Sequence, residues 1–470
     1  MLQALDRQET LTGNQKKLIA AGTFGVVLEF LDYFLIGFVL TFVARPWGLT
    51  FGISSVILLS SGVGAMIGAA FFGWLADAIG RRKVFLTTIA VFTVASAALV
   101  FTPESREIGW IYLTVFRFLI GFGAGGLYCV DLPLIQEFVP SNKRGVVTGL
   151  VTSAVPAGFL IGSALVTLLA SSIGWRGLMG VCVLLALLTL FIRTWIPESP
   201  RWLIQNNRLE EARKAVAWAL EVDPNTLPLT AAVRQGPQPK LSELFRYPRS
   251  VAVSWITNLG TQTGYYGLTL WSPTLIVQFL HVPPQQAAFY MIFVTLAALA
   301  GRVVLSILSE KIGRRASGVL CGGGAVVMLL IAAMFGETLA TVAAFFLGVL
   351  MIAYFFGEGG FAIVGPYSGE VWPTTLRTTG MGAAYGFGGI GKIIGPLGLA
   401  LIVGASASTA PTAAGISYQA AFLYFAGWYA VSALAFLFLG IETKGRTIEN
   451  IEEVLEAQLS NRPVKAAAGS

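Results

Sequence analysis

Twelve long apolar stretches dominate the chain, and short polar segments separate them. A helix that crosses a bilayer needs about 20 mostly apolar residues, whereas a membrane β-barrel shows segments of about ten residues with alternating polarity. The pattern therefore predicts an all-α membrane protein. Its expected transmembrane helices are 18–43, 55–77, 83–101, 110–136, 145–170, 176–196, 250–279, 286–309, 316–335, 339–365, 378–404 and 417–440.

Polar motifs between these stretches occur twice at the same spacing. The segment "GWLADAIGRRK" at 73–83 returns as "SILSEKIGRRA" at 306–316, and "EFVPSNKRG" at 137–145 returns as "EVWPTTLRT" at 370–378. Both second copies follow their first copies after the same number of residues, and this constant offset indicates a duplicated unit. We expect four parts: an N-terminal six-helix bundle (1–196), a cytoplasmic linker with short helices (197–248), a C-terminal six-helix bundle (249–440) and a cytoplasmic tail (441–470).

Composition and charge agree with a membrane location. Hydrophobic residues make up 55% of the chain and charged residues 12%, against roughly 25% charged residues in soluble domains; the mean hydropathy is +0.74. With the N-terminus inside, the outer loops hold only Arg45, Arg106 and Arg176, so most Lys and Arg residues face the cytoplasm. The net charge of +7 is thus spread over short loops, which argues against a nucleic-acid-binding surface.

The sequence shows no signature of enzymatic chemistry. The Gly-rich "GFGAGG" at 121–126 follows no strand and lies inside a predicted helix. Cys129, Cys182 and Cys321 fall in apolar segments without metal-like or disulfide-like spacing. The single histidine, His281, lies in a predicted outer loop. We therefore expect neither an enzyme nor a bound cofactor or metal.

Charged residues gather at the inner ends of the predicted helices in both halves. Isolated solvated charges would each contribute only about 0–1 kcal/mol, but the repetition of the whole set favours a network. The residues expected to form a cytoplasmic gate are Asp77, Arg81, Glu137, Arg144, Glu198, Glu310, Arg314, Glu370, Arg377 and Glu442.

Three loop motifs, "GWLADAIGRRK", "PESPRWL" and "ETKGR", resemble those of sugar porters in the major facilitator superfamily. The resemblance implies two six-helix bundles, a substrate site near the bilayer midplane, and an ion-pair network that closes the cytoplasmic side. The segment "YSGEVWPTTLRTTGMG" at 367–382 is similar to organic-ion transporters and synaptic-vesicle glycoproteins. Within this branch the chain looks most like bacterial nicotinate transporters, which implies a bacterial inner membrane.

Ionisable residues inside the predicted helices are functional candidates, because an unpaired charge in the bilayer costs several kcal/mol. They are Glu29, Asp32, Arg117, Asp131, Arg302, Glu358 and Lys392. Asp32 and Arg117 fall at matching depths, and the resemblance implies an acid facing an arginine at these positions in proton symporters. We expect protonation of Asp32 to loosen this pair, with Glu29 as a second proton carrier. A static ion pair, without proton coupling, is the alternative.

The segment "WITNLGTQTGYYGLTLWSP" at 255–273 is unusually polar and aromatic for a membrane helix. Aromatic faces suit a flat ring, and amides or a cation can orient its carboxylate. The residues expected to bind substrate are Tyr33, Tyr128, Asn258, Gln262, Tyr265, Tyr266, Phe356, Glu358, Tyr385 and Lys392. Each aromatic could instead pack or face lipid, and Lys392 could instead snorkel or pair with Glu358.

These features together predict a monomeric secondary active transporter that imports a small aromatic organic anion with protons by alternating access. Three alternatives stay open: a sugar or polyol symporter, an organic cation transporter, and a sensor that binds without transport.

Overall fold

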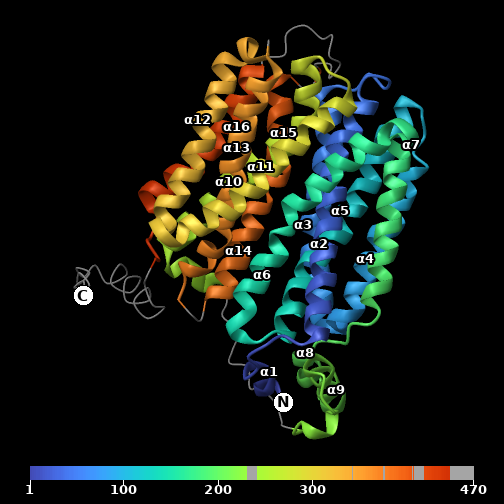
Figure 1. Cartoon of the computed structure of the whole chain (residues 1–470), viewed down its shortest axis with the longest axis vertical. Helices are drawn as coiled ribbons and strands as arrows, with labels where there is room; N and C mark the ends of the chain where they lie inside the picture. Colours follow the sequence, from blue (N-terminus) through green and yellow to red (C-terminus); the bar gives the residue numbers. More distant parts are fainter. Residues whose placement is uncertain (230–240, 341, 374–375, 405, 407–417, 445–470) are drawn as a thin grey trace, which may run out of the picture. The chain divides into compact units, whose positions relative to one another are not determined.

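The computed structural model describes residues 1–229, 241–340, 342–373, 376–404, 406 and 418–444, and its elements are all helices (Figure 1). The chain divides into two units. The first holds the described residues of Met1–Gln235, Ser272–Ile292 and Ala405–Ala413, and the second holds those of Gly236–Trp271, Phe293–Gly404 and Ala414–Ser470. The predicted tail at 441–470 is described only as far as residue 444, and the predicted domain boundaries stay predictions.

The helices before residue 229 carry the predicted N-terminal spans and the described part of the linker. They are α1 (Leu2–Asp6), α2 (Gly13–Val43), α3 (Phe51–Ile79), α4 (Arg81–Val100), α5 (Arg106–Phe138), η1 (Ser141–Lys143), α6 (Arg144–Thr152), α7 (Ala154–Arg193), α8 (Pro200–Gln205), α9 (Leu209–Leu220) and η2 (Pro224–Thr226). The predicted break between 170 and 176 lies at Gly174, where a φ of 66° interrupts α7.

The helices after the linker carry the predicted C-terminal spans. They are η3 (Leu241–Arg246), α10 (Pro248–Leu280), α11 (Pro284–Ile312), α12 (Arg314–Ala340), α13 (Ala343–Glu370), α14 (Arg377–Gly389), α15 (Gly391–Val403) and α16 (Tyr418–Leu439). The predicted span 378–404 therefore comprises two consecutive helices, which meet at Ile390.

Ten helical segments of the described chain are long and apolar enough to cross a membrane. One of these ten segments, Val146–Arg193, covers both predicted spans along α6 and α7. None of the ten lies in α10. Helix α10 is polar because it carries residues such as Asn258 and Gln262, and both of these are buried. Burial removes the cost of placing such groups against lipid.

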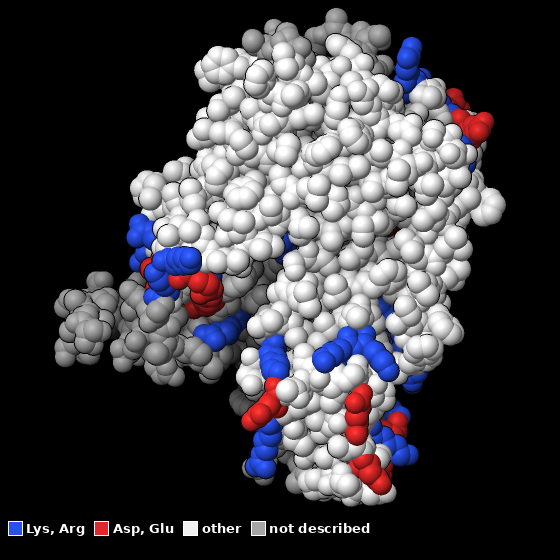
Figure 2. All heavy atoms as spheres, in the orientation of Figure 1, with Lys and Arg blue, Asp and Glu red and all other residues white. Residues whose placement is uncertain are grey.

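Apolar side chains cover much of the outer surface. Leu168, Leu184 and Phe438 are each more than half exposed, which is expected of lipid-facing positions. On the face drawn in Figure 2, side chains other than Lys, Arg, Asp and Glu cover most of the surface, and the charged side chains gather in a few groups. Large exposed apolar surfaces of this kind fit helices that lie in hydrocarbon.

Helices α3 and α5 approach so closely that their backbones touch. A Cβ added to Gly121 would lie 2.0 Å from the backbone oxygen of Ser61, and one added to Gly125 would lie 2.1 Å from that of Ala65. Small residues permit this contact where lipid provides no hydrophobic driving force between helices. This helix contact also fixes the position of Arg117 relative to α3, because Arg117 lies on α5 one turn before Gly121.

The linker helices are fastened to the beginning of α2. Thr12 caps α2 through Gln15, and its hydroxyl donates a hydrogen bond to the carbonyl of Ala219 (2.5 Å). The backbone N–H of Asn14 donates to Oε1 of Glu221 (2.8 Å). Helix α9 is therefore part of the first unit.

The α3–α5 contact generates a stability prediction. Gly121→Ala forces the two backbones apart, and overpacking of this kind costs about 1–3 kcal/mol. The matched control is Gly180→Ala in α7, because a Cβ at Gly180 meets nothing within 4 Å. Thermal unfolding in detergent should show a lower Tm for Gly121→Ala and an unchanged or higher Tm for the control. Equal Tm values for the two variants would contradict the close packing.

Candidate functional site

The first network joins predicted gate residues of the N-terminal half. Arg81 pairs with Glu137, and the hydroxyl of Ser199 donates a hydrogen bond to the same carboxylate. Oε1 of Glu198 accepts the backbone N–H groups of Arg82 and Ser199, both at 2.9 Å. Glu198 thus caps the beginning of α4, where a carboxylate also complements the helix dipole.

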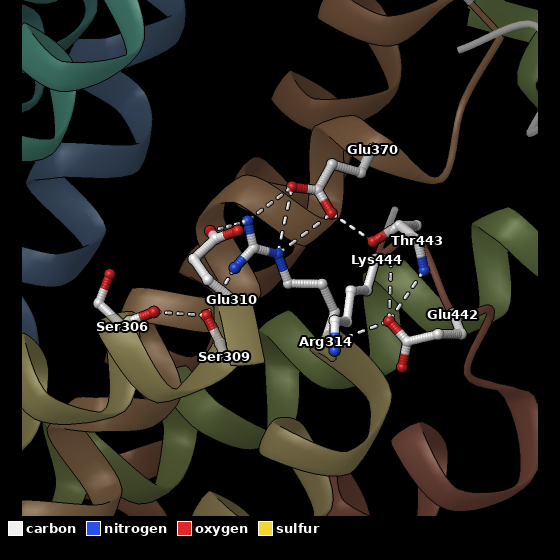
Figure 3. Close-up of polar contacts among 8 residues, drawn as sticks. All are labelled: Ser306, Ser309, Glu310, Arg314, Glu370, Glu442, Thr443 and Lys444. Atoms are coloured by element: carbon white, nitrogen blue, oxygen red, sulfur yellow. Dashed lines mark hydrogen bonds and ion pairs between the residues drawn. The ribbon is translucent and has the colours of Figure 1, made fainter. Parts of the chain in front are cut away.

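The second network repeats this arrangement in the C-terminal half (Figure 3). Arg314 pairs with Glu370 at 3.2 Å, and the hydroxyl of Thr443 donates to Glu370. Glu442 caps α12: Oε1 accepts the N–H of Arg314 (2.9 Å) and Oε2 accepts that of Arg315 (3.2 Å). The same four roles therefore occur in both units.

A glycine with positive φ makes room for each capping carboxylate. Gly80 has a φ of 105° and Gly313 a φ of 94°, values that side chains rarely allow. A Cβ at Gly80 would lie 2.5 Å from Oε2 of Glu198, and one at Gly313 would lie 2.5 Å from Oε2 of Glu442. Both the backbone and the available space therefore require glycine.

Not every predicted gate residue joins these networks in the same way. Nη2 of Arg314 pairs with Glu310 at 2.7 Å, but Glu310 is 70% exposed. Arg144 donates through Nε to the carbonyl of Gln136 (2.9 Å) and lies 3.5 Å from Asp6. Nε of its counterpart Arg377 has no hydrogen-bond partner in the described residues. The side chain of Asp77 lies outside the described residues.

Asp32 of α2 and Arg117 of α5 form a fully buried ion pair, as expected from the sequence. Nη1 of Arg117 lies 2.7 Å from Oδ2 of Asp32. The guanidinium also donates to the carbonyls of Asp32 (3.0 Å) and Tyr33 (3.2 Å) and to the hydroxyl of Ser61 (3.0 Å). Oδ1 of Asp32 has no hydrogen-bond partner within the described chain. Two other helices, α2 and α3, thus hold the arginine, while Oδ1 of the acid accepts no hydrogen bond within the described residues.

The other two candidates on α2 lie beside this pair. Glu29 is buried one turn before Asp32 and interacts electrostatically with Tyr33. The ring of Tyr33 is buried edge-on against Phe34, with the centroids 5.5 Å apart. The structure therefore places all three residues in one buried region of the first unit.

Glu358 of α13 pairs with Arg302 of α11 in the second unit. The glutamate is fully buried, and the arginine side chain is 12% exposed. Tyr265 interacts electrostatically with Glu358 and packs on Phe361 with the centroids 5.0 Å apart. Arg302 was recognised in the sequence as a charge within a helix, but its partnership with Glu358 was not predicted.

The two amides of α10 form a chain of hydrogen bonds. Nδ2 of Asn258 donates to the hydroxyl of Ser368 (2.6 Å). Nε2 of Gln262 makes only long contacts, 3.4 Å to Oδ1 of Asn258 and 3.4 Å to the carbonyl of Tyr385. Oε1 of Gln262 has no partner among the residues described. Gln262 therefore retains hydrogen-bonding capacity although it is fully buried.

Lys392 of α15 lies over an aromatic ring of the same unit. Its Nζ is 4.9 Å from the ring centroid of Tyr266, a cation–π distance. Tyr266 also packs edge-on against Tyr265, with the centroids 5.6 Å apart. Phe356 packs instead on Phe355, and the side chain of Tyr128 lies outside the described residues. The second unit thus combines a cation, amides and aromatic rings.

A second buried ion pair, between Asp131 and Arg193, was also not predicted. Arg193 binds Asp131 with both Nη atoms, at 2.8 and 2.7 Å. Asp131 was expected as a charge within a helix, but Arg193, near the end of the predicted helix 176–196, was not among the functional candidates. A helical period of buried small residues, Cys182, Ala186 and Thr189, leads to Arg193 and could have indicated its inward orientation.

The networks predict that the buried acid Glu137, which we assign as the hub, contributes more to stability than the exposed acid Glu310. Glu137→Gln leaves Arg81 without its charge partner at a site where the acid is 8% exposed, so we expect a loss of about 1–3 kcal/mol. Glu310→Gln, at 70% exposure, should cost about 0–1 kcal/mol. Thermal unfolding in detergent measures both; a larger loss for Glu310→Gln would refute the assignment of Glu137 as the hub.

Known proteins are similar to this chain in sequence and in architecture. The family model for "Sugar (and other) transporter" matches residues 15–455. The niacin transporter NiaP of Acinetobacter baylyi is 29% identical over 91% of this chain and 94% of its own length. The probable 4-methylmuconolactone transporter of Cupriavidus pinatubonensis is 28% identical over 93% of each chain.

The fold has close counterparts among solved structures. The xylose transporter XylE from E. coli, in a partially occluded inward open conformation, superposes with a TM-score of 0.73 over 93% of this chain and 100% of that chain. The sequences are 16% identical, so this similarity concerns the fold. The expected twelve-helix major facilitator architecture is confirmed, and the chain belongs to the sugar (and other) transporter family.

Proposed function

We propose that this membrane transporter imports a small aromatic organic anion, such as nicotinate, together with protons by alternating access. The observation that carries the proposal is the placement of Lys392 over Tyr266 beside the amides of α10. The ring of a flat anion can stack on a tyrosine while its carboxylate pairs with the lysine. Gln262 can then bond a polar ring atom, since its own contacts are long.

Proton coupling is supported by the geometry of Asp32. Arg117 engages Oδ2, and the partnerless Oδ1 is buried with it. A proton can therefore be added at Oδ1 without first displacing the arginine. Protonation removes the negative charge and weakens the ion pair, because charge-assisted hydrogen bonds are about twice as strong as neutral ones. Release of the proton restores the pair and completes the cycle.

The two inner-face networks would form the cytoplasmic gate. Each network ties the end of one helix to the beginning of another through a carboxylate that accepts several donors. Such contacts lie at helix ends, where they can break as a group when the helices separate. We place both termini in the cytoplasm and the protein, as a monomer, in a bacterial inner membrane, in accord with the distribution of Lys and Arg.

A sugar or polyol is the second candidate substrate. The amides Asn258 and Gln262 favour it, because amides suit hydroxyl groups. A neutral sugar, however, would leave Lys392 without a function in binding. Competition experiments separate the two substrates.

Uptake by proteoliposomes tests the substrate. Labelled nicotinate should accumulate only in the presence of protein and more strongly with an inward proton gradient, and excess glucose should not compete. Lys392→Gln should weaken nicotinate uptake about tenfold or more, since a lost charge-assisted bond is worth about 1.5–3 kcal/mol. Lys214→Gln, at an exposed position on α9, is the control. Absence of uptake, or competition by glucose, would reject the aromatic-anion assignment.

The coupling role of Asp32 is tested by an isosteric change. Asp32→Asn should abolish gradient-driven accumulation and preserve exchange of labelled for unlabelled nicotinate, because exchange requires no net proton movement. Both are measured in the same proteoliposome preparation. Undiminished accumulation would exclude Asp32 as the proton carrier and direct attention to Glu29 or Glu358.

A further inference from the structure

The buried amide of Gln262 on α10 has one unsatisfied atom. The side chain is fully buried, and its Oε1 accepts no hydrogen bond from the residues that the structure describes. A polar atom shut away from both water and a partner costs free energy, which a bound partner restores. Whether that partner must be a donor or an acceptor depends on which end of the amide carries the oxygen.

Neighbouring hydrogen bonds fix the orientation of this amide. The hydroxyl of Ser368 donates to the carbonyl of Val364 (2.6 Å), so it accepts from Nδ2 of Asn258 (2.6 Å). Oδ1 of Asn258 is then the atom that faces Gln262. Nε2 of Gln262 lies 3.4 Å from this oxygen and 3.4 Å from the carbonyl oxygen of Tyr385. Exchanging the nitrogen and the oxygen of Gln262 would set an oxygen against two oxygens, so the unsatisfied atom is an acceptor.

Helix α10 runs beside α14 and α15 in the same direction. A Cβ added to Gly388 of α14 would lie 2.3 Å from Nε2 of Gln262. Further along, a Cβ added to Gly395 of α15 would lie 2.7 Å from the backbone nitrogen of Gly267 on α10. The two contacts advance together along both chains, so residues at equal distances beyond Gln262 and Gly388 lie at similar heights.

The proposed anion-binding pair follows one turn after this amide. Tyr266 lies four residues after Gln262, and Lys392 lies four residues after Gly388. Ile390, where α14 and α15 meet, keeps helical angles (φ −57°, ψ −29°). Four residues of helix advance by about 6 Å. The lysine and the ring of Tyr266 therefore stand about one helical turn from the unsatisfied oxygen.

An aromatic carboxylate can bridge this separation. When its carboxylate pairs with Lys392 and its ring lies along Tyr266 toward Gln262, the ring carbon opposite the carboxylate reaches the level of the amide. A hydroxyl or amino group on that carbon donates a hydrogen bond to Oε1. An ether oxygen or a pyridine nitrogen only accepts, so it leaves Oε1 unpaired.

We propose that Gln262 selects aromatic carboxylates that carry an O–H or N–H donor on the ring carbon opposite the carboxylate. This inference rests on the proposed aromatic-anion site and narrows its substrate class: such compounds bind more tightly than nicotinate. A site with a buried acceptor discriminates against ligands that lack the donor, because the acceptor then stays unpaired in the complex.

Titration calorimetry of the purified protein in detergent tests this preference without depending on transport. 4-Hydroxybenzoate and 4-aminobenzoate should bind about tenfold more tightly than benzoate or nicotinate, since they satisfy a buried acceptor. 4-Methoxybenzoate has an oxygen at the same place but no donor, and 2-hydroxybenzoate has its donor beside the carboxylate. Neither of these two compounds should bind more tightly than benzoate.

A variant without the acceptor should lose the preference. Gln262→Met keeps the length of the side chain, and it should lower the advantage of 4-hydroxybenzoate from about tenfold to about one while leaving the Kd of benzoate within about threefold. Thr257→Val is the matched control. Thr257 is also fully buried on α10, and its hydroxyl donates to the carbonyls of Val253 and Ser254 within its own helix. This control should retain the tenfold preference.

Two results would overturn the inference. Equal affinities for 4-hydroxybenzoate and benzoate in the unmodified protein would mean that water, rather than the ligand, satisfies Oε1. A Gln262→Met variant that keeps the preference would assign the selection to another residue. The comparison of ligands in the unmodified protein stands even if the variant fails to fold. Binding without preference rejects this inference alone, whereas absence of binding by all of these compounds rejects the proposed function with it.

Discussion

A charged side chain in the hydrocarbon layer must be neutralised or hydrated, and this constraint determines how the interior of each unit is built. In the first unit, the carboxylates of Asp32 and Asp131 each bind an arginine from another helix. In the second unit, Glu358 binds Arg302. The ion pairs are also contacts between helices, so a change in protonation necessarily alters how those helices are held. This link between charge and packing is the physical basis of the proposed coupling.

The helix ends that carry the two networks follow a different principle. There the carboxylates Glu198 and Glu442 bind backbone N–H groups at helix beginnings, and glycines with positive φ leave space for them. The contacts in the two units use equivalent residues although the intervening sequences differ. Such an arrangement resists small displacements and can be lost as a whole, which suits a gate better than a permanent support.

Much of the architecture could be predicted because lipid imposes a simple rule on sequence: long apolar segments become helices. The rule predicted α10 as well, although its polar residues keep it outside the apolar segments found by composition. The pair Asp32–Arg117 could be predicted from matching depths. Arg193 could not, because an arginine at the end of an apolar stretch normally reaches the membrane surface, and only tertiary packing against Gly25 and Phe85 reveals its burial. The hydroxyls of Ser199 and Thr443 were likewise missed, since serine and threonine carry no charge pattern to follow.

The central claim is that an aromatic anion and a proton enter together. It is tested most directly by adding nicotinate to proteoliposomes in a weakly buffered medium and recording the external pH. The account predicts a protein-dependent alkalinisation of the medium that matches nicotinate uptake mole for mole. Protein-dependent nicotinate uptake without any change in external pH would contradict it.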